Sequence, residues 1–122
     1  MQYLLLVYAD EKHWAGLSEA EKERHWVDCQ AYGRQLMDGG HFLAGAPLEP
    51  SATARSIRKL DETASVTDGP FAETKEVLAG YFLVECKDID EAVALGKQFP
   101  GVRRGDGLEV RALREDRIMR LP

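Results

Sequence analysis

The stretch Thr67-Asp68-Gly69-Pro70-Phe71-Ala72-Glu73-Thr74-Lys75-Glu76 joins two runs of residues that are typical of β-strands. Gly69 gives the backbone freedom to turn sharply, and Pro70 fixes its own φ near the value of a first helical turn. The stretch therefore predicts a strand, a sharp corner and then one short helical turn. Asp68 would stand at the end of the strand, beside the corner.

The sequence on both sides of this corner predicts alternating strands and helices. Ser18-x-x-Glu21 and Asp88-x-x-Glu91 have the form of a capping box, and each opens a helix, the first reaching about Asp38 and the second stopping at Pro100-Gly101. We expect strands at residues 2–8, 41–46, 53–59, 63–67, 80–86 and 108–113. This order predicts one α+β domain over residues 1–122, a ferredoxin-like βαββαβ arrangement with the hairpin at 53–67 inserted.

The apolar pattern indicates which surfaces need cover. The first helix is predicted to face the sheet with Trp26, Cys29, Gly33, Leu36 and Met37, and Gly33 would allow a close approach. Two helices cover only one face of a sheet, and we expect the other face to carry an apolar set: Leu4, Leu6, Phe82 and Val84. Because leaving such a surface in water is unfavourable, a second subunit packed sheet to sheet is expected. The alternative is a monomer whose inserted hairpin folds over this face.

Composition excludes several classes of protein. A formal charge of −5 argues against a nucleic-acid partner, which would need clustered Lys and Arg. The C-terminal arginines are diluted by acids and are typical of a solvated or subunit-pairing surface. The apolar run Leu4 to Ala9 is too short for a signal segment or a membrane span, so no membrane partner and a cytoplasmic location are expected. Cys29 and Cys86 have no CxxC spacing and are predicted to be buried, reduced thiols.

Asp68 is the candidate catalytic residue. A carboxylate held at a strand end beside a cavity could have a raised pKa and act as a general acid or base. It could equally accept backbone N–H groups in an Asx turn. Arg58 is a candidate anion-binding residue for a substrate, or else the partner of Asp68 in a structural ion pair that would lower the pKa of the aspartate. The sequence leaves these alternatives open.

Glu73 and Lys75 are the other candidate substrate-binding residues. On a short helical turn, Glu73 and Glu76 would share a face while Lys75 projects elsewhere. A solvated turn explains the same charges.

The spacing of His13, His25 and His41 matches no metal-binding motif, and nucleotide-binding glycine patterns are absent from the sequence. We therefore predict no metal and no cofactor.

Residues 68–76, DGPFAETKE, resemble the DGPF motif of the YCII-related family without a mismatch. The similarity continues in family order through Gln2–Tyr8, Leu48–Pro50, Ala52–Ala54, Arg58, Gly80–Leu83 and Glu109–Arg111. Ala112 stands where many members have proline, which leaves the last strand free to hydrogen-bond there. The resemblance implies a dimeric α/β barrel and, for some members, an association with extracytoplasmic-function sigma factors. Some relatives carry an Asp–His pair, for which His41 is the only strand histidine here.

Two functions follow as expectations. The first is a cofactor-free enzyme that acts on a small molecule, with Asp68 as acid or base and Arg58 as anion anchor. The second is a non-enzymatic, ligand-sensing or regulatory module linked to sigma factors.

Overall fold

The computed structural model describes residues 1–122, except for the side chain of Leu60. Its elements, in chain order, are β1 (Gln2–Asp10), α1 (Glu11–Ala15), α2 (Glu19–Asp38), β2 (Phe42–Pro47), β3 (Arg55–Leu60), β4 (Thr63–Asp68), β5 (Glu76–Glu85), α3 (Ile89–Lys97), α4 (Pro100–Arg103) and β6 (Gly107–Ala112). Short 3-10 turns lie at Ser51–Thr53 and Glu115–Arg117. None of the helices in the described chain has the length and apolar character needed to cross a membrane.

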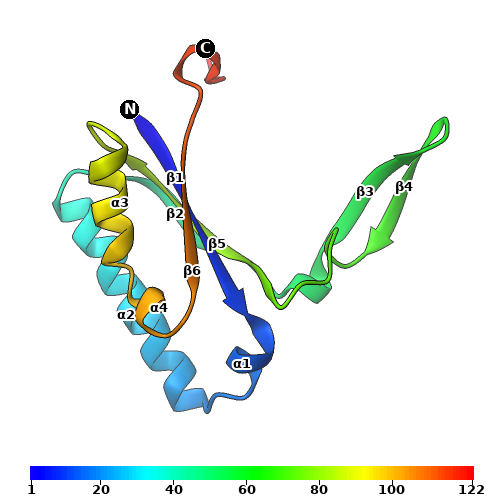
Figure 1. Ribbon diagram of the computed structural model, residues 1–122, viewed down its shortest axis with the longest axis horizontal. Helices are drawn as coiled ribbons and strands as arrows, with labels where there is room; N and C mark the ends of the chain where they lie inside the picture. Colours follow the sequence, from blue (N-terminus) through cyan, green and yellow to red (C-terminus); the bar gives the residue numbers. More distant parts are fainter.

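A four-stranded antiparallel sheet forms the centre of the fold (Figure 1). Its strand order is β2-β5-β1-β6. The predicted α+β class is therefore confirmed. Within the described part of this single chain the sheet stays open and does not close into a barrel.

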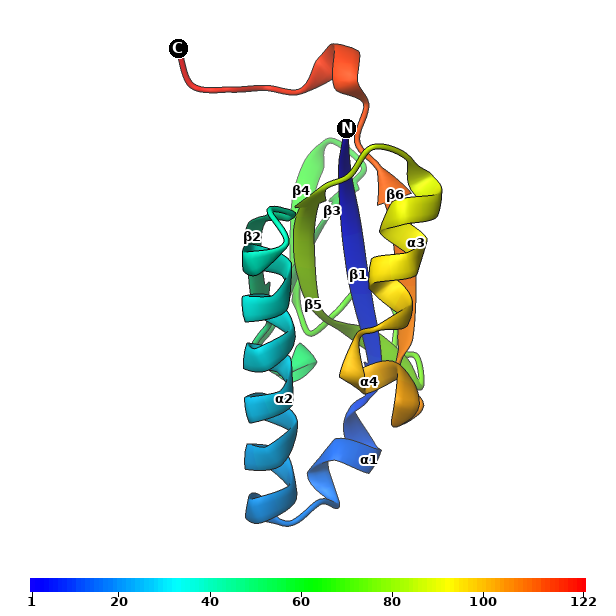
Figure 2. The same ribbon diagram turned by 90° about the vertical axis from the view of Figure 1, so that its left-hand side faces the viewer.

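Helices α2 and α3 cover one face of this sheet (Figure 2). The strand residues that face them include Tyr3, Leu5 and Val7 of β1, and Leu5 is completely buried. Tyr32 of α2 joins the layers, because its hydroxyl donates a hydrogen bond of 2.6 Å to the Leu95 carbonyl. Its ring also makes edge-to-face contacts with Phe82 and Phe99, at 5.3 and 5.4 Å between centroids.

Phe82 and Val84 lie on the helix-covered face, so the prediction that they belong to the opposite face was wrong. The register sets Phe82 opposite Leu5 and Val84 opposite Tyr3, and paired residues share a face. Along β5, the residues of both alternating sets are apolar, so the sequence pattern alone could not decide which set faces the helices. The face without helices, here called the open face, carries a set of large apolar side chains that are half-buried: Leu4, Leu6, Tyr8, Tyr81 and Leu83.

The inward side of α2 also differs from the prediction. Leu36 is buried as expected, but Trp26 is 43% and Met37 54% exposed, and Tyr32 takes their place. A Cβ added to Gly33 would meet nothing within 4 Å, so this glycine faces open space and permits no close approach.

The capping box at Ser18 and Glu21 is present as predicted. The short helix α1 was not predicted. Asp10 begins it by accepting hydrogen bonds from the backbone N–H groups of Lys12 and His13. Pro100 stands at the first position of the separate short helix α4, where its missing N–H costs nothing.

The hairpin β3–β4, here called the arm, projects away from the sheet (Figure 1). Its existence and the corner at Gly69 are confirmed, with Gly69 at φ 93°. The helical turn predicted after Pro70 does not form, and residues 70–75 are irregular. The Gly69 N–H donates to the Ala54 carbonyl and the Ser56 hydroxyl donates to the Gly69 carbonyl. The chain is thereby held along the start of β3.

Candidate functional site

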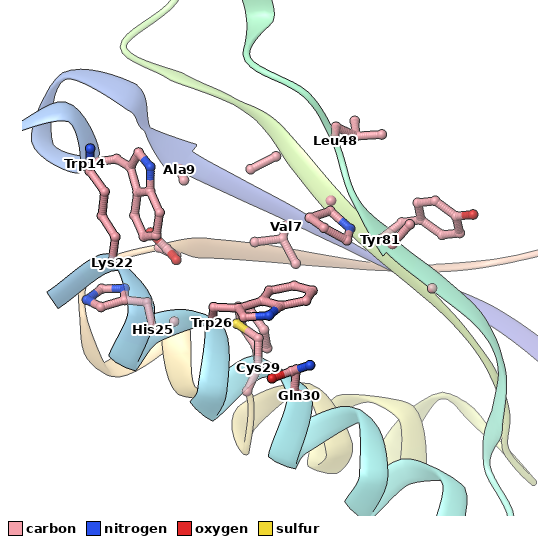
Figure 3. Close-up of a pocket in the computed structure, with 18 of the residues that line it drawn as sticks. Val7, Ala9, Trp14, Lys22, His25, Trp26, Cys29, Gln30, Leu48 and Tyr81 are labelled. Atoms are coloured by element: carbon pink, nitrogen blue, oxygen red, sulfur yellow. The ribbon is translucent and has the colours of Figure 1, made fainter. Parts of the chain in front are cut away.

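A cavity of about 810 Å³ lies between α2 and the helix-covered face of the sheet (Figure 3). It exists because α2 packs through its C-terminal half only: its buried side chains are Tyr32 and Leu36. The N-terminal half stands away from the strands, and α1 with Leu17 lies at the lower end. Gly33 borders the same space, which explains why a Cβ there would touch nothing.

The walls of this cavity are mainly apolar and aromatic. Val7 and Ala9 of β1 face Trp26 of α2 across the space (Figure 3). The Trp14 ring meets the imidazole of His25 edge to face, with 5.3 Å between centroids. Phe42, Phe82 and Phe99 complete the wall toward the core. Such a lining fits an organic molecule with an apolar or aromatic body.

Polar side chains from α2 and from the α4–β6 connection gather in the same cavity. His25, Cys29, Arg104 and Asp106 all line it. Arg104 forms an ion pair with Asp28 of α2 through its Nη2 atom. Its Nη1 atom is buried and has no hydrogen-bond partner among the described residues. A guanidinium N–H that is removed from water without an acceptor is costly, so an acceptor is expected to bind there.

The environment changes the pKa values of three of these groups. Burial lowers the pKa of His25, and the positive charge of Arg104 lowers it further. Burial raises the pKa of the Cys29 thiol, although Arg104 opposes this effect. Burial likewise raises the pKa of Asp106. At neutral pH the cavity therefore combines a neutral imidazole that can accept a proton, a fixed guanidinium cation and a protonated thiol.

The residues predicted from sequence lie elsewhere, on or near the arm. Asp68 ends β4 with 87% of its side chain exposed, and Arg58, Glu73 and Lys75 are also exposed. These four residues do not line the cavity of their own chain.

The sequence offered Arg58 either as an anion-binding residue or as the ion-pair partner of Asp68. The ion pair between Arg58 and Asp68 was wrong. The strand register sets Arg55 opposite Asp68 and Arg58 opposite Ser65. Arg55 Nε lies 3.2 Å from Asp68 Oδ1, while the Arg58 guanidinium stacks on Phe71 at 4.4 Å from the ring centroid.

Sequence reasoning missed His25 and Arg104. A signal was present for His25, because His25, Cys29 and Gly33 recur at intervals of four and so share one side of α2. Arg104 was hidden in the run of C-terminal arginines, which gave no sign that one of them is half-buried and pairs with α2.

We predict that the imidazole of His25 titrates below its ordinary pKa of about 6.5 in the folded protein and near that value in urea. Because the folded-state pKa is the lower one, His25 destabilises the fold as pH falls through the unfolded-state value, and the loss is complete below the folded-state pKa. A ¹H–¹³C NMR titration of the His25 ring, with and without urea, measures the folded-state and unfolded-state pKa values. A folded-state value at or above 6.5 would mean that the ring is not desolvated in the cavity.

Comparison with known proteins gives the family of the chain. The model of the YCII-related domain matches residues 1–115. An uncharacterised protein of Rhizobium meliloti (strain 1021) is 36% identical over 114 residues, which cover 93% of this chain and 92% of that protein. The chain belongs to the YCII-related family.

Proposed function

We propose that this protein binds a small organic molecule with an apolar or aromatic body and one anionic group, in the cavity beneath α2. The observation that carries this proposal is that Arg104 lines the cavity while its Nη1 atom is buried without a hydrogen-bond partner among the described residues. Asp28 pairs with the guanidinium through Nη2 and makes no hydrogen bond to Nη1. A carboxylate or phosphate oxygen of a ligand would complete its hydrogen bonds.

Size and lining support the same class of ligand. The cavity volume of about 810 Å³ falls within the range of about 300 to 1,000 Å³ that is typical of small-molecule sites. Trp14 and Trp26 provide aromatic surface for the body of the ligand, and the neutral imidazole of His25 supplies a further hydrogen-bonding group.

We predict that Arg104→Met weakens the binding of aromatic carboxylates by about 10- to 100-fold, the effect of losing one charge-assisted hydrogen bond. Arg103→Met is the matched control, because Arg103 is the exposed neighbour and does not line the cavity. Quenching of tryptophan fluorescence by a panel of carboxylates and their neutral amides measures both variants. Equal effects of the two substitutions, or a panel in which the amides bind as tightly as the acids, would refute the anion site.

We further propose that two copies pack through their open faces in a dimeric α/β barrel built from ferredoxin-like subunits. The order β2-β5-β1-β6 is compatible with that plan. Leu4, Leu6, Tyr81 and Leu83 support a partner on the open face. The arm supports it too, because a two-stranded hairpin is marginally stable alone, and its paired Ile57 and Val66 are 62% and 61% exposed.

Sedimentation velocity should find a dimer at micromolar concentration, and Leu6→Glu should convert it to a monomer or unfold it, because a carboxylate would be buried in the interface. Val27→Glu is the control: Val27 is 51% exposed on α2, the layer that covers the opposite face of the sheet. A well-behaved monomer for the unmodified chain would rule out the dimer.

An enzymatic role for Asp68, with Arg58, Glu73 and Lys75 as substrate-binding residues, remains a second proposal. Its support is the motif itself and the dimer: an 87% exposed carboxylate is an effective acid or base only if another surface desolvates it. The arm of one subunit would have to meet the partner for this to occur. The link to sigma factors stays a prediction from the family resemblance.

Asp68→Asn tests this second proposal, with Asp61→Asn at the exposed tip of the arm as control. Asn keeps the shape of Asp68 but cannot titrate, and Asp61 has φ 57°, which asparagine also tolerates. We expect both variants to keep the thermal midpoint, while only Asp68→Asn loses turnover of ligands found in the binding panel. If the unmodified chain turns over a ligand and the Asp68→Asn variant does so as well, Asp68 is not the acid or base.

A further inference from the structure

Three side chains with metal-binding atoms meet at the end of the sheet where β5 leads into α3. His41 precedes β2, Cys86 follows β5, and Glu91 lies in the first turn of α3. One ligand atom from each lies within 4.8 Å of the others. None of the three lines the cavity beneath α2, so this cluster is independent of the proposed binding site.

The backbone around each of these residues is fixed by hydrogen bonds. The Glu85 N–H donates to the His41 carbonyl at 2.8 Å, which ties β2 to the end of β5. The Cys86 N–H donates to the Met1 carbonyl at 2.9 Å, and the N-terminal amine donates to the Cys86 carbonyl at 3.0 Å. Glu91 is held by the capping bond from its N–H to Asp88. The backbone at the three residues is therefore held before any ion binds.

We propose that His41, Cys86 and Glu91 bind a zinc-type divalent transition-metal ion. Thiolate, imidazole and carboxylate are the three side-chain ligands that zinc takes, whereas magnesium and calcium prefer oxygen alone. Zinc–ligand bonds of about 2.0 to 2.3 Å require ligand atoms about 3.3 to 3.7 Å apart in a tetrahedral site. The three ligand atoms lie within 4.8 Å of one another, so side-chain rotations would have to bring them into that range.

The contacts of His41 indicate which ring nitrogen would bind the ion. Its Nδ1 lies 2.8 Å from the Glu85 carbonyl oxygen and 3.9 Å from Glu91 Oε1. Nδ1 is thus the ring nitrogen beside Glu91, and an ion bound to it would replace its contact with the Glu85 carbonyl. Cys86 is 3% exposed, while His41 and Glu91 are half-buried, so the ion enters from their side. Three protein ligands leave a fourth position for water.

Cobalt(II) is the probe for this site, because a bound thiolate gives it an intense near-ultraviolet charge-transfer band and tetrahedral geometry gives it strong visible bands. We expect the full, untagged chain to show both bands on titration with one equivalent of cobalt and to lose them when zinc is added. A hundredfold excess of free zinc over its Kd should raise the thermal midpoint by roughly 10 °C.

Variants assign the ligands. Cys86→Ser should abolish the charge-transfer band, and Glu91→Gln should weaken zinc binding at least about tenfold while its amide oxygen still accepts the Lys87 N–H. Cys29→Ser, which changes the other free thiol, should leave the band unchanged. No thiolate band in the folded chain, or a band that survives Cys86→Ser or disappears in Cys29→Ser, overturns the proposal.

Discussion

The contact of Tyr32 with the sheet and with α3 fixes the position of α2, and the rest of the structure depends on it. Its hydroxyl reaches the Leu95 carbonyl, and its ring meets Phe82 and Phe99, so one side chain joins α2, β5 and the segment that follows α3. Tyr32 lies in the C-terminal half of a 20-residue helix that is about 30 Å long. The other half extends beyond this contact and leaves the cavity open.

The charges in the cavity follow from the same arrangement. Helix α4 brings Arg104 against Asp28 on α2, where one guanidinium nitrogen pairs with the carboxylate and another is buried without an acceptor. Burial, together with the same cation, lowers the pKa of His25. A ligand that supplies one anionic oxygen would satisfy Arg104, and its body would fill an aromatic space that water fills poorly.

The sequence was sufficient where local chemistry determines structure. The capping box at Ser18, the corner at Gly69 and the two strands of the arm were predicted because each depends on a few adjacent residues. The faces of β5 were not predictable, because Phe82 and Leu83 are both apolar and only pairing with β1 separates them.

The candidate site was harder to predict for the same reason. Asp68 was conspicuous because of its motif, whereas Arg104 becomes distinctive only when folding pairs it with Asp28 on a helix far away in the sequence. His41, Cys86 and Glu91 likewise come together only through the sheet. Arrangements of this kind depend on tertiary contacts, which residue spacing does not encode.

The most direct test of the cavity as the binding site is a crystal structure of the protein with the tightest aromatic carboxylate from the binding panel. The account predicts that the ring of the ligand lies beside Trp26 and that one carboxylate oxygen accepts a hydrogen bond from Arg104 Nη1. A ligand bound along the arm or on the open face, with the cavity beneath α2 filled only by water, would contradict it.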